Sequence, residues 1–148
     1  MYDRVIRMLK EADVQYEATE HEPVRTSWQA AKVRGVPLRT GVKAMVLKTL
    51  EGNLLLVLIP ADRRVDMKKM AELEKTSYVS LASPEEVFGL TGCRLGAVPP
   101  FGHKTKLKTY MHKAILENEQ VNFNAGLRTR SVRMRSKDLE KFIKPVMF

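Results

Sequence analysis

Two apolar segments separated by a short polar turn constrain the fold of this chain more than any other feature. Val42 to Leu50 and Leu54 to Ile59 flank Glu51-Gly52-Asn53, and a glycine-containing break of this length predicts a β-hairpin. The second segment is apolar on both faces, so we expect it to be a central strand. A chain of 148 residues has the size of one domain with one substantial core. We therefore expect residues 1–148 to form a single domain around this hairpin.

Helix and strand signals precede the hairpin. Apolar residues at helical spacing predict an amphipathic helix over Tyr2 to Ala12. Val14, Tyr16 and Ala18 alternate with polar residues and predict a half-buried strand that ends near His21. Ser27 is the expected N-cap of a short helix through Val33, with Gly35 and Pro37 as its stop.

Further elements are predicted after the hairpin. Asp66 is expected to cap a helix that carries Met70 and Leu73, and Ser83-Pro84-Glu85-Glu86 has the residues of a capping box. Gly92 to Gly102 is rich in glycine and proline, which predicts a constrained loop. Val121 to Phe123 and Ser131 to Met134 predict short strands, and Ser136 a cap for a last helix with Leu139 and Phe142. Helices interspersed irregularly among strands favour an α+β fold with a mixed sheet.

The charge of the chain indicates a polyanionic partner. The net charge is +9 with a pI near 9.8, which favours RNA, DNA or an anionic membrane over a neutral partner, although solubility alone also explains it. No long helix combines a basic face with bulky apolar residues, which disfavours the membrane. The longest apolar run is too short to span a bilayer and no signal-peptide core precedes it, so we expect a cytoplasmic protein.

Neither a metal nor a cofactor is expected. Cys93 is the only cysteine, and the three histidines lack the spacing of metal ligands. The glycine-rich sequences that bind nucleotide phosphates are absent. Cys93 beside Arg94 is a conceivable nucleophile, but a lone cysteine is more often a small buried residue.

Six fragments in order carry a resemblance to one family. They are HEPVRTSWQAAKVRGVP, VKAMVLK, LLLVLIPADRRVDMKKMAEL, TGCRLGAVPPFG, NAG and a late DL. Their succession resembles the YbaK-type family, related to the editing domain of bacterial prolyl-tRNA synthetases. The resemblance implies a compact α+β domain with a curved mixed sheet, or partial barrel, flanked by helices. It also implies a cofactor-free deacylase that hydrolyses mischarged tRNA, most commonly a prolyl tRNA carrying a small wrong amino acid such as alanine or cysteine.

The resemblance assigns site residues one by one. The family's strand-borne lysine falls on Lys43, and its GxxxP loop on Gly96, Ala97, Val98, Pro99 and Pro100, with Phe101 and Gly102 next to it. Lys43 and Gly96 are the catalytic candidates. Asn124 and Gly126 match a family turn, and His21 and Thr26 lie in its early HEP-containing segment. Together with Ala97, Val98, Pro99, Pro100, Phe101 and Gly102 of the loop, they are the substrate-binding candidates. Ala44 departs from the family's usual polar residue, and the basic Tyr110-Met111-His112-Lys113 replaces an acidic stretch, which puts amino-acid and tRNA specificity in question.

The chemistry suits these residue types. An aminoacyl ester is already activated, so a catalyst mainly positions water and stabilises charge on the carbonyl oxygen. Lysine supplies three donors and a compact positive charge for the carbonyl, a phosphate or the water. Taken without the family, Lys43 is an ordinary strand-end lysine and the loop an ordinary tight connection.

The basic residues are candidate RNA contacts. Lys104, Lys106 and Lys108 follow the loop and are expected to contact tRNA phosphates. Arg133 and Arg135 should share a strand face, and for them and for Arg63, Arg64, Lys68 and Lys69 a solvated surface is an equal explanation. Trp28 is expected in the core or pocket wall. The expected partner is aminoacyl-tRNA, with a synthetase as a second candidate and neither DNA nor a membrane; the alternative function is a noncatalytic tRNA-binding module of the same fold.

Overall fold

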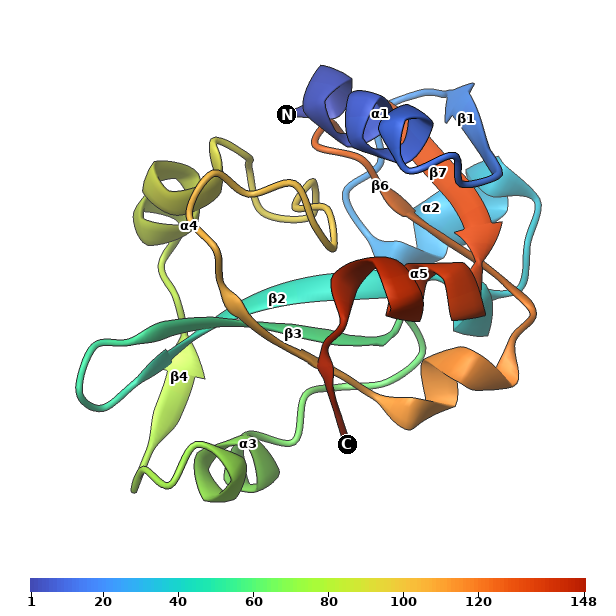
Figure 1. Cartoon of the computed structure of the whole chain (residues 1–148). Helices are drawn as coiled ribbons and strands as arrows, with labels where there is room; N and C mark the ends of the chain where they lie inside the picture. The colour runs from blue at the N-terminus through green and yellow to red at the C-terminus, as the bar shows by residue number, and fades with distance from the viewer.

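The computed structural model describes residues 1–148 and contains five α-helices and two β-sheets (Figure 1). The larger sheet has the strand order β4-β2-β3-β5-β8, formed by Val79–Leu81, Val42–Thr49, Leu54–Pro60, Lys108–Met111 and Val146–Met147. It is mixed, because β3 pairs antiparallel with β2 but parallel with β5. The smaller sheet is antiparallel with the order β1-β7-β6, formed by Tyr16–Glu20, Arg130–Arg135 and Gln120–Asn124.

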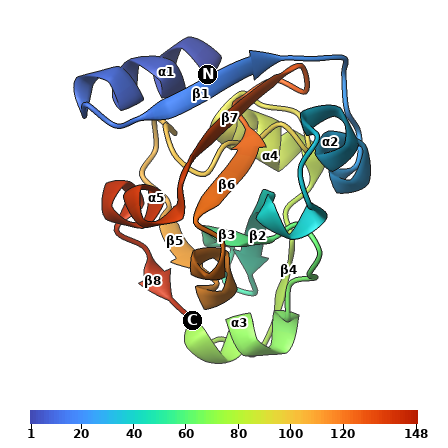
Figure 2. The same ribbon diagram turned by 90° about the vertical axis from the view of Figure 1, so that its right-hand side faces the viewer.

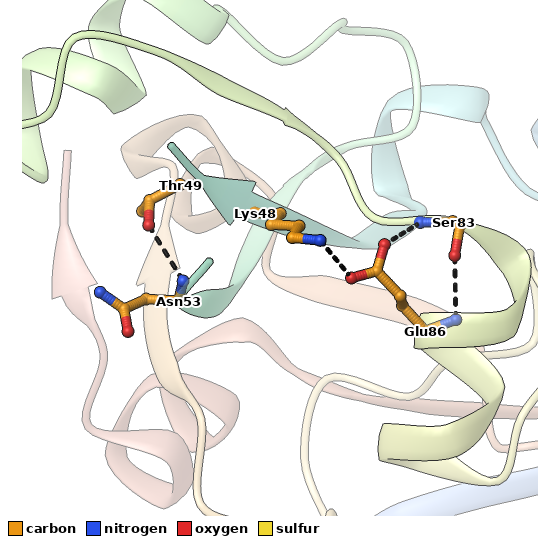
Figure 3. Close-up of polar contacts among 5 residues, drawn as sticks. All are labelled: Lys48, Thr49, Asn53, Ser83 and Glu86. Carbon is orange, nitrogen blue, oxygen red and sulfur yellow. Dashed lines mark hydrogen bonds and ion pairs between the residues drawn. The ribbon is translucent and has the colours of Figure 1, made fainter. Parts of the chain in front are cut away.

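The predicted hairpin forms β2 and β3, and β3 is central as expected. Gly52 adopts a φ of 91° in the turn, a conformation that favours glycine. Asn53 N donates to Thr49 Oγ1 at 3.1 Å across the same turn (Figure 3). Strand β3 is apolar on both faces because each face meets a different core. Leu56 and Leu58 belong to the larger cluster, whereas Leu55, Val57 and Ile59 pack with Met70 in a smaller one.

The two sheets meet where β2 begins. Gly41 forms an isolated parallel bridge with Asn122 of β6, so the small sheet continues the curve of the large one without closing a barrel (Figure 2). The expected α+β class and partial barrel are therefore confirmed. The strands form two sheets instead of the one mixed sheet expected. Lys43 lies in β2 at the junction of these sheets, two residues after Gly41.

Five helices cover the sheets. They are α1 (Tyr2–Glu11), α2 (Ser27–Arg34), α3 (Met67–Leu73), α4 (Pro84–Thr91) and α5 (Ser136–Ile143), with 3₁₀ turns at Leu38–Thr40 and Lys113–Glu117. Helix α1 lies beside the small sheet, and α2 lies over the junction of the two sheets (Figures 1 and 2). Val5 and Leu9 form the buried stripe of α1, as its periodicity predicts. Every helix is too short or too polar to cross a membrane.

The predicted caps of α3 and α4 are confirmed. Asp66 accepts a hydrogen bond from Lys69 N. Ser83 Oγ accepts from Glu86 N and Glu86 Oε1 accepts from Ser83 N, each at 3.1 Å, which completes the capping box (Figure 3). The same Glu86 carboxylate pairs with Lys48 Nζ at 2.8 Å. The box therefore starts α4 and also ties this helix to strand β2.

Some local expectations are wrong. Thr26 rather than Ser27 caps α2, because its side chain accepts from Gln29 N. Ser136 does not cap α5; its hydroxyl donates to Asn118 O. Ala18 is exposed, although Tyr16 of the same strand, β1, packs against the core as expected. Trp28 is 71% exposed and belongs to neither core cluster.

Candidate functional site

A cavity of about 260 Å³ lies at the junction of the two sheets. Helix α2 and strands β2 and β6 contribute to its wall, together with α4 and the loop that follows α4. Most of the lining is apolar, including Val24, Ala30, Leu38, Val42, Val46 and Val87. A mainly apolar concave site with a few polar groups is the usual form of a small-ligand pocket. Its volume is below the range typical of drug-sized ligands, which limits the contents to a small group.

Lys43 lies in the wall of this cavity, near the start of β2. Its backbone is fixed by pairing with Ile59 of β3, and its Nζ donates to Arg63 O at 2.6 Å. Burial lowers the pKa of Lys43 from its ordinary value, an effect that Asp62 opposes and Arg64 reinforces. One donor of the ammonium is occupied, so two remain for a ligand.

Gly96 and Asn124 reach the same cavity from different elements. Gly96 has a φ of 84°, a conformation that side-chain-bearing residues rarely adopt. Asn124, at the end of β6, donates from Nδ2 to Gly96 O at 2.6 Å. Gly126 N donates to Ala97 O at 2.9 Å. Arg128, in the turn after β6, also donates from Nε and Nη2 to Leu95 O at 3.2 and 2.8 Å. The loop that contains Gly96 is therefore fastened to β6 and the turn after it by four hydrogen bonds. Thr26 and Val98 complete the predicted residues that line the cavity.

The remaining predicted residues of the loop face the core. Five loop residues are buried and absent from the cavity lining: Ala97, Pro99, Pro100, Phe101 and Gly102. Phe101 packs on Phe123 and Phe142 with ring centroids 5.8 and 4.6 Å away. Gly102 O accepts from Arg4 Nε of α1, and Gly126 lies against Met1. These residues support the loop instead of contributing surface to the cavity.

His21 does not line the cavity, and its hydrogen-bond partners, Glu22 and Ser131, do not line it either. Its Nε2 lies 2.6 Å from Ser131 Oγ and its Nδ1 lies 2.8 Å from Glu22 O. Because a carbonyl oxygen only accepts, Nδ1 is the nitrogen that carries a proton toward Glu22 O.

Arg34 is the prominent cavity residue that sequence reasoning missed. It ends α2 and donates to Ser131 Oγ, Asn122 Oδ1 and Asn124 Oδ1 at 2.8, 2.7 and 2.6 Å. Burial lowers the pKa of Arg34 to about 10, so the guanidinium is still charged at neutral pH. An arginine in the last turn before Gly35 is typical of an ordinary helix end. Its acceptors lie on strands far away in the sequence, so no local sequence pattern predicts its role.

The three predicted RNA-binding lysines differ in their surroundings. Lys104 and Lys106 are exposed on the segment after the loop. Lys108, in β5, pairs with Glu74 at 2.7 Å and lies 5.2 Å from the centre of the Tyr110 ring, and these contacts raise its pKa. Arg133 and Arg135 are both exposed, as their alternation predicts.

Two other side chains bear on the chemistry of the site. Cys93 is buried, and burial raises the pKa of its thiol, which confirms the expectation of a small buried residue over a nucleophile. Trp28 follows Thr26 and Ser27, which line the cavity, but is not itself part of the lining. Its ring is exposed, and an exposed aromatic ring is suited to stacking on an unpaired base.

Comparisons with known proteins agree on one family. A sequence profile for the aminoacyl-tRNA editing domain matches residues 21–142. The chain is 33% identical to the multifunctional Ser/Thr-tRNA deacylase ProXp-y of Escherichia coli K12, with 97% of this chain and 89% of that protein covered. It is 26% identical to the prolyl-tRNA editing protein ProX of Acetoanaerobium sticklandii over 95% of this chain and 88% of the relative. Among solved structures, hypothetical protein APE2540 superimposes with a TM-score of 0.90 and 26% identity, covering 97% of this chain and 96% of that one.

Proposed function

The chain belongs to the aminoacyl-tRNA editing domain family, and we propose that its whole length acts as one editing domain with the cavity beside Lys43 as the site of hydrolysis. The relative in Escherichia coli is named a tRNA deacylase, that is, a hydrolase of the aminoacyl-tRNA ester. The observation that supports this site most is the convergence of Lys43, Gly96 and Asn124 on one small cavity. These residues come from a strand, a loop and a second strand that are far apart in the sequence.

The proposed reaction is attack of water on the ester carbonyl carbon. The bond between that carbon and the ribose oxygen breaks, the ribose oxygen takes a proton, and the products are a free amino acid and tRNA with a free terminal hydroxyl. Negative charge develops on the carbonyl oxygen during the attack. The ammonium of Lys43 supplies fixed positive charge at the cavity wall for that oxygen, which is the largest kind of contribution in such reactions.

Lys43 can act without a large rearrangement. Its bond to Arg63 O holds the ammonium in place, and the donors that remain are free for the substrate. The volume of about 260 Å³ fits an aminoacyl group with its ribose better than a longer stretch of tRNA. We therefore assign the cavity to the aminoacyl end and the surface around it to the tRNA.

For the amino acid we propose a small side chain, alanine or cysteine on a prolyl tRNA. The apolar lining next to Lys43, including Ala44 and Val46, favours such a side chain, and the relative named ProX edits prolyl-tRNA. Serine or threonine is a second candidate, because the relative with 33% identity is named a Ser/Thr-tRNA deacylase. The polar wall with Thr26 and Asn124 offers partners for a side-chain hydroxyl.

For the tRNA we propose contacts on the exposed surface near the cavity. Lys104 and Lys106 are exposed and follow the loop, which suits phosphate binding. The ring of Trp28 is available to stack on an unpaired base of the acceptor end. Lys108 already pairs with Glu74, so we expect it to contribute less to phosphate binding.

The test is a panel of prolyl and other tRNAs charged with alanine, cysteine, serine, threonine or proline, each incubated with the protein. Release of alanine or cysteine from prolyl tRNA that is faster than release from the other substrates supports the first candidate. Fastest release of serine or threonine supports the second. Binding of tRNA with no release from any substrate would refute hydrolysis and leave the noncatalytic tRNA-binding module.

A further inference from the structure

Arg34 is a cation without a counterion in the wall of the cavity. The ion pairs of the structure are Lys48–Glu86, Lys108–Glu74 and Arg130–Glu20, and none includes Arg34. All three of its hydrogen bonds go to neutral oxygens. Arg34 is partly buried, and removing a charge from water is costly unless the charge is well hydrogen-bonded; solubility is better served by an exposed arginine. This cost indicates that the guanidinium has a structural or functional role at this position.

The acceptors of Arg34 lie on one face of the small sheet. Asn122 and Asn124 are two residues apart on β6, and Ser131 of β7 is the direct partner of Asn124, so the three side chains point the same way. Both Asn122 and Ser131 are nearly fully buried. The fork of the guanidinium bonds all three at once, a geometry that the single nitrogen of lysine cannot reproduce.

The contacts of Arg34 fix the direction of two amides. A guanidinium only donates, so the side-chain oxygens of Asn122 and Asn124 must face it and their NH₂ groups must face away. Asn122 Nδ2 then donates to Thr40 Oγ1 at 2.9 Å, and Asn124 Nδ2 donates to Gly96 O at 2.6 Å. In a flipped Asn124 amide, Oδ1 would face Gly96 O and the NH₂ group would face the guanidinium, so both contacts would become repulsive. Arg34 therefore holds Asn124 in the orientation that bonds the Gly96 loop.

We propose that Arg34 is a positioning residue of the deacylation site: by orienting the Asn124 amide it holds the Gly96 loop at the distance from Lys43 that the reaction requires. The proposal rests on the proposed function, because it assigns Arg34 to that same site. Arg34 thus acts through Asn124 and does not need to touch the substrate. His21 is the outermost member of the same network, linked through Ser131.

The kinetic experiment is single-turnover deacylation of the best substrate of the panel, with enzyme in excess. The variants are Arg34→Lys, Asn124→Ala and the double variant, with Arg39→Lys as the control because Arg39 is exposed close by and lies outside the cavity lining. We expect Arg34→Lys to lower the saturating rate constant on the order of 10²-fold through misplacement of the loop. Half-saturating enzyme concentration should change less than about threefold, since a single side chain adds little to a many-phosphate interface. Arg39→Lys should match the wild type.

The double variant tests whether Arg34 acts through Asn124. If it does, adding Arg34→Lys to Asn124→Ala lowers the rate no further than Asn124→Ala alone, because coupled residues are non-additive. Multiplying effects would overturn the proposal, as would wild-type rates for Arg34→Lys, which would show that the charge suffices without the fork. Circular dichroism and thermal melting identify variants that fail to fold, and Arg34→Lys is chosen over an apolar replacement because it keeps the charge.

A second readout needs no catalysis. In ¹⁵N spectra of the labelled protein, Arg34→Lys should shift the side-chain NH₂ signals of Asn124 and the backbone amide of Ala97, whereas Arg39→Lys should not. Unchanged signals would overturn the positioning role. If the wild type hydrolyses no aminoacyl-tRNA, the proposed function fails on its own, and these spectra still decide whether Arg34 orients the loop.

Discussion

Replacing Gly41 by alanine should strain the junction on which the site is built. A Cβ on Gly41 would lie 2.9 Å from Ala61 Cβ and 3.4 Å from Leu38 O, whereas carbon atoms pack best about 3.5–4.0 Å apart. Ala61 has little freedom to withdraw, because its N donates to Gly41 O at 2.8 Å. Gly41 also bridges to Asn122, so the strain falls where the two sheets meet.

The magnitude follows from the overlap and is best measured as a coupling. Overpacking of this kind costs about 1–3 kcal/mol. Gly41→Ala also lowers the conformational entropy of the unfolded chain and Ala61→Gly raises it. Each of these changes alters the free energy of unfolding by about 0.4–1 kcal/mol. In a double-mutant cycle these unfolded-state effects cancel. Ala61→Gly removes the clashing methyl, so the coupling energy should equal the relieved strain of about 1–3 kcal/mol.

The assay is urea unfolding of the wild type, both single variants and the double variant. The free energies of unfolding should show that Ala61→Gly restores stability to Gly41→Ala although it destabilises the wild type. Deacylation by Gly41→Ala should fall as well, because Gly41 lines the cavity. A coupling below about 0.5 kcal/mol, the level of ordinary additivity, would refute the close approach of the two Cβ atoms and the requirement for glycine at the junction.

Four further predictions concern separate parts of the molecule. Ser83→Ala should lower stability by about 1 kcal/mol because the helix cap is removed, seen in thermal melts, with deacylation unchanged; inactivity of this variant would show that α4 matters for catalysis. Trp28→Ala should weaken tRNA binding by about 1–3 kcal/mol if the ring stacks on a base, while Phe88→Ala, also exposed, should not; equal affinities would exclude stacking. Joint replacement of Lys104 and Lys106 by alanine should reduce the slope of log K against log salt concentration for tRNA binding by roughly 0.7 for each phosphate that the protein no longer neutralises, and an unchanged slope would place the tRNA elsewhere. Because the proposed role of Lys43 requires its cation and the pKa of Lys43 is lowered from 10.5, enzymatic hydrolysis above the spontaneous rate should fall as pH rises through this lowered pKa; a rate that keeps rising through that range would contradict the role of the charged form.

The sequence predicts the elements whose signals are local. The hairpin of β2 and β3, the cap of α3 and the capping box of α4 depend on neighbouring residues and are found where expected. Strands β4, β5 and β8 are not predicted, because Val79–Leu81, Lys108–Met111 and Val146–Met147 are short and owe their conformation to pairing with distant strands. The choice of Thr26 over Ser27 as cap is a shift of one residue, which is common at helix ends.

The candidate site is predictable only where a motif marks it. Resemblance to a family marks Lys43, Gly96 and Asn124 as candidates, and in the structure all three line one cavity. Pro99 to Gly102 belong to the same motif yet lie in the core, since a sequence motif does not distinguish residues that support a loop from those that face a ligand. Arg34 is not predicted from the sequence because its role depends on acceptors on β6 and β7, which come close to it only in the folded chain.

The most direct test of the central claim is single-turnover deacylation by Lys43→Ala beside Lys48→Ala. Both remove one lysine from β2, but Lys48 pairs with Glu86 and lies outside the cavity. We predict that Lys43→Ala slows hydrolysis on the order of 10²- to 10³-fold, the effect of removing one oxyanion donor, with fold and tRNA affinity retained, and that Lys48→Ala stays close to the wild type. Full activity of Lys43→Ala would contradict the assignment of the reaction to this lysine and this cavity.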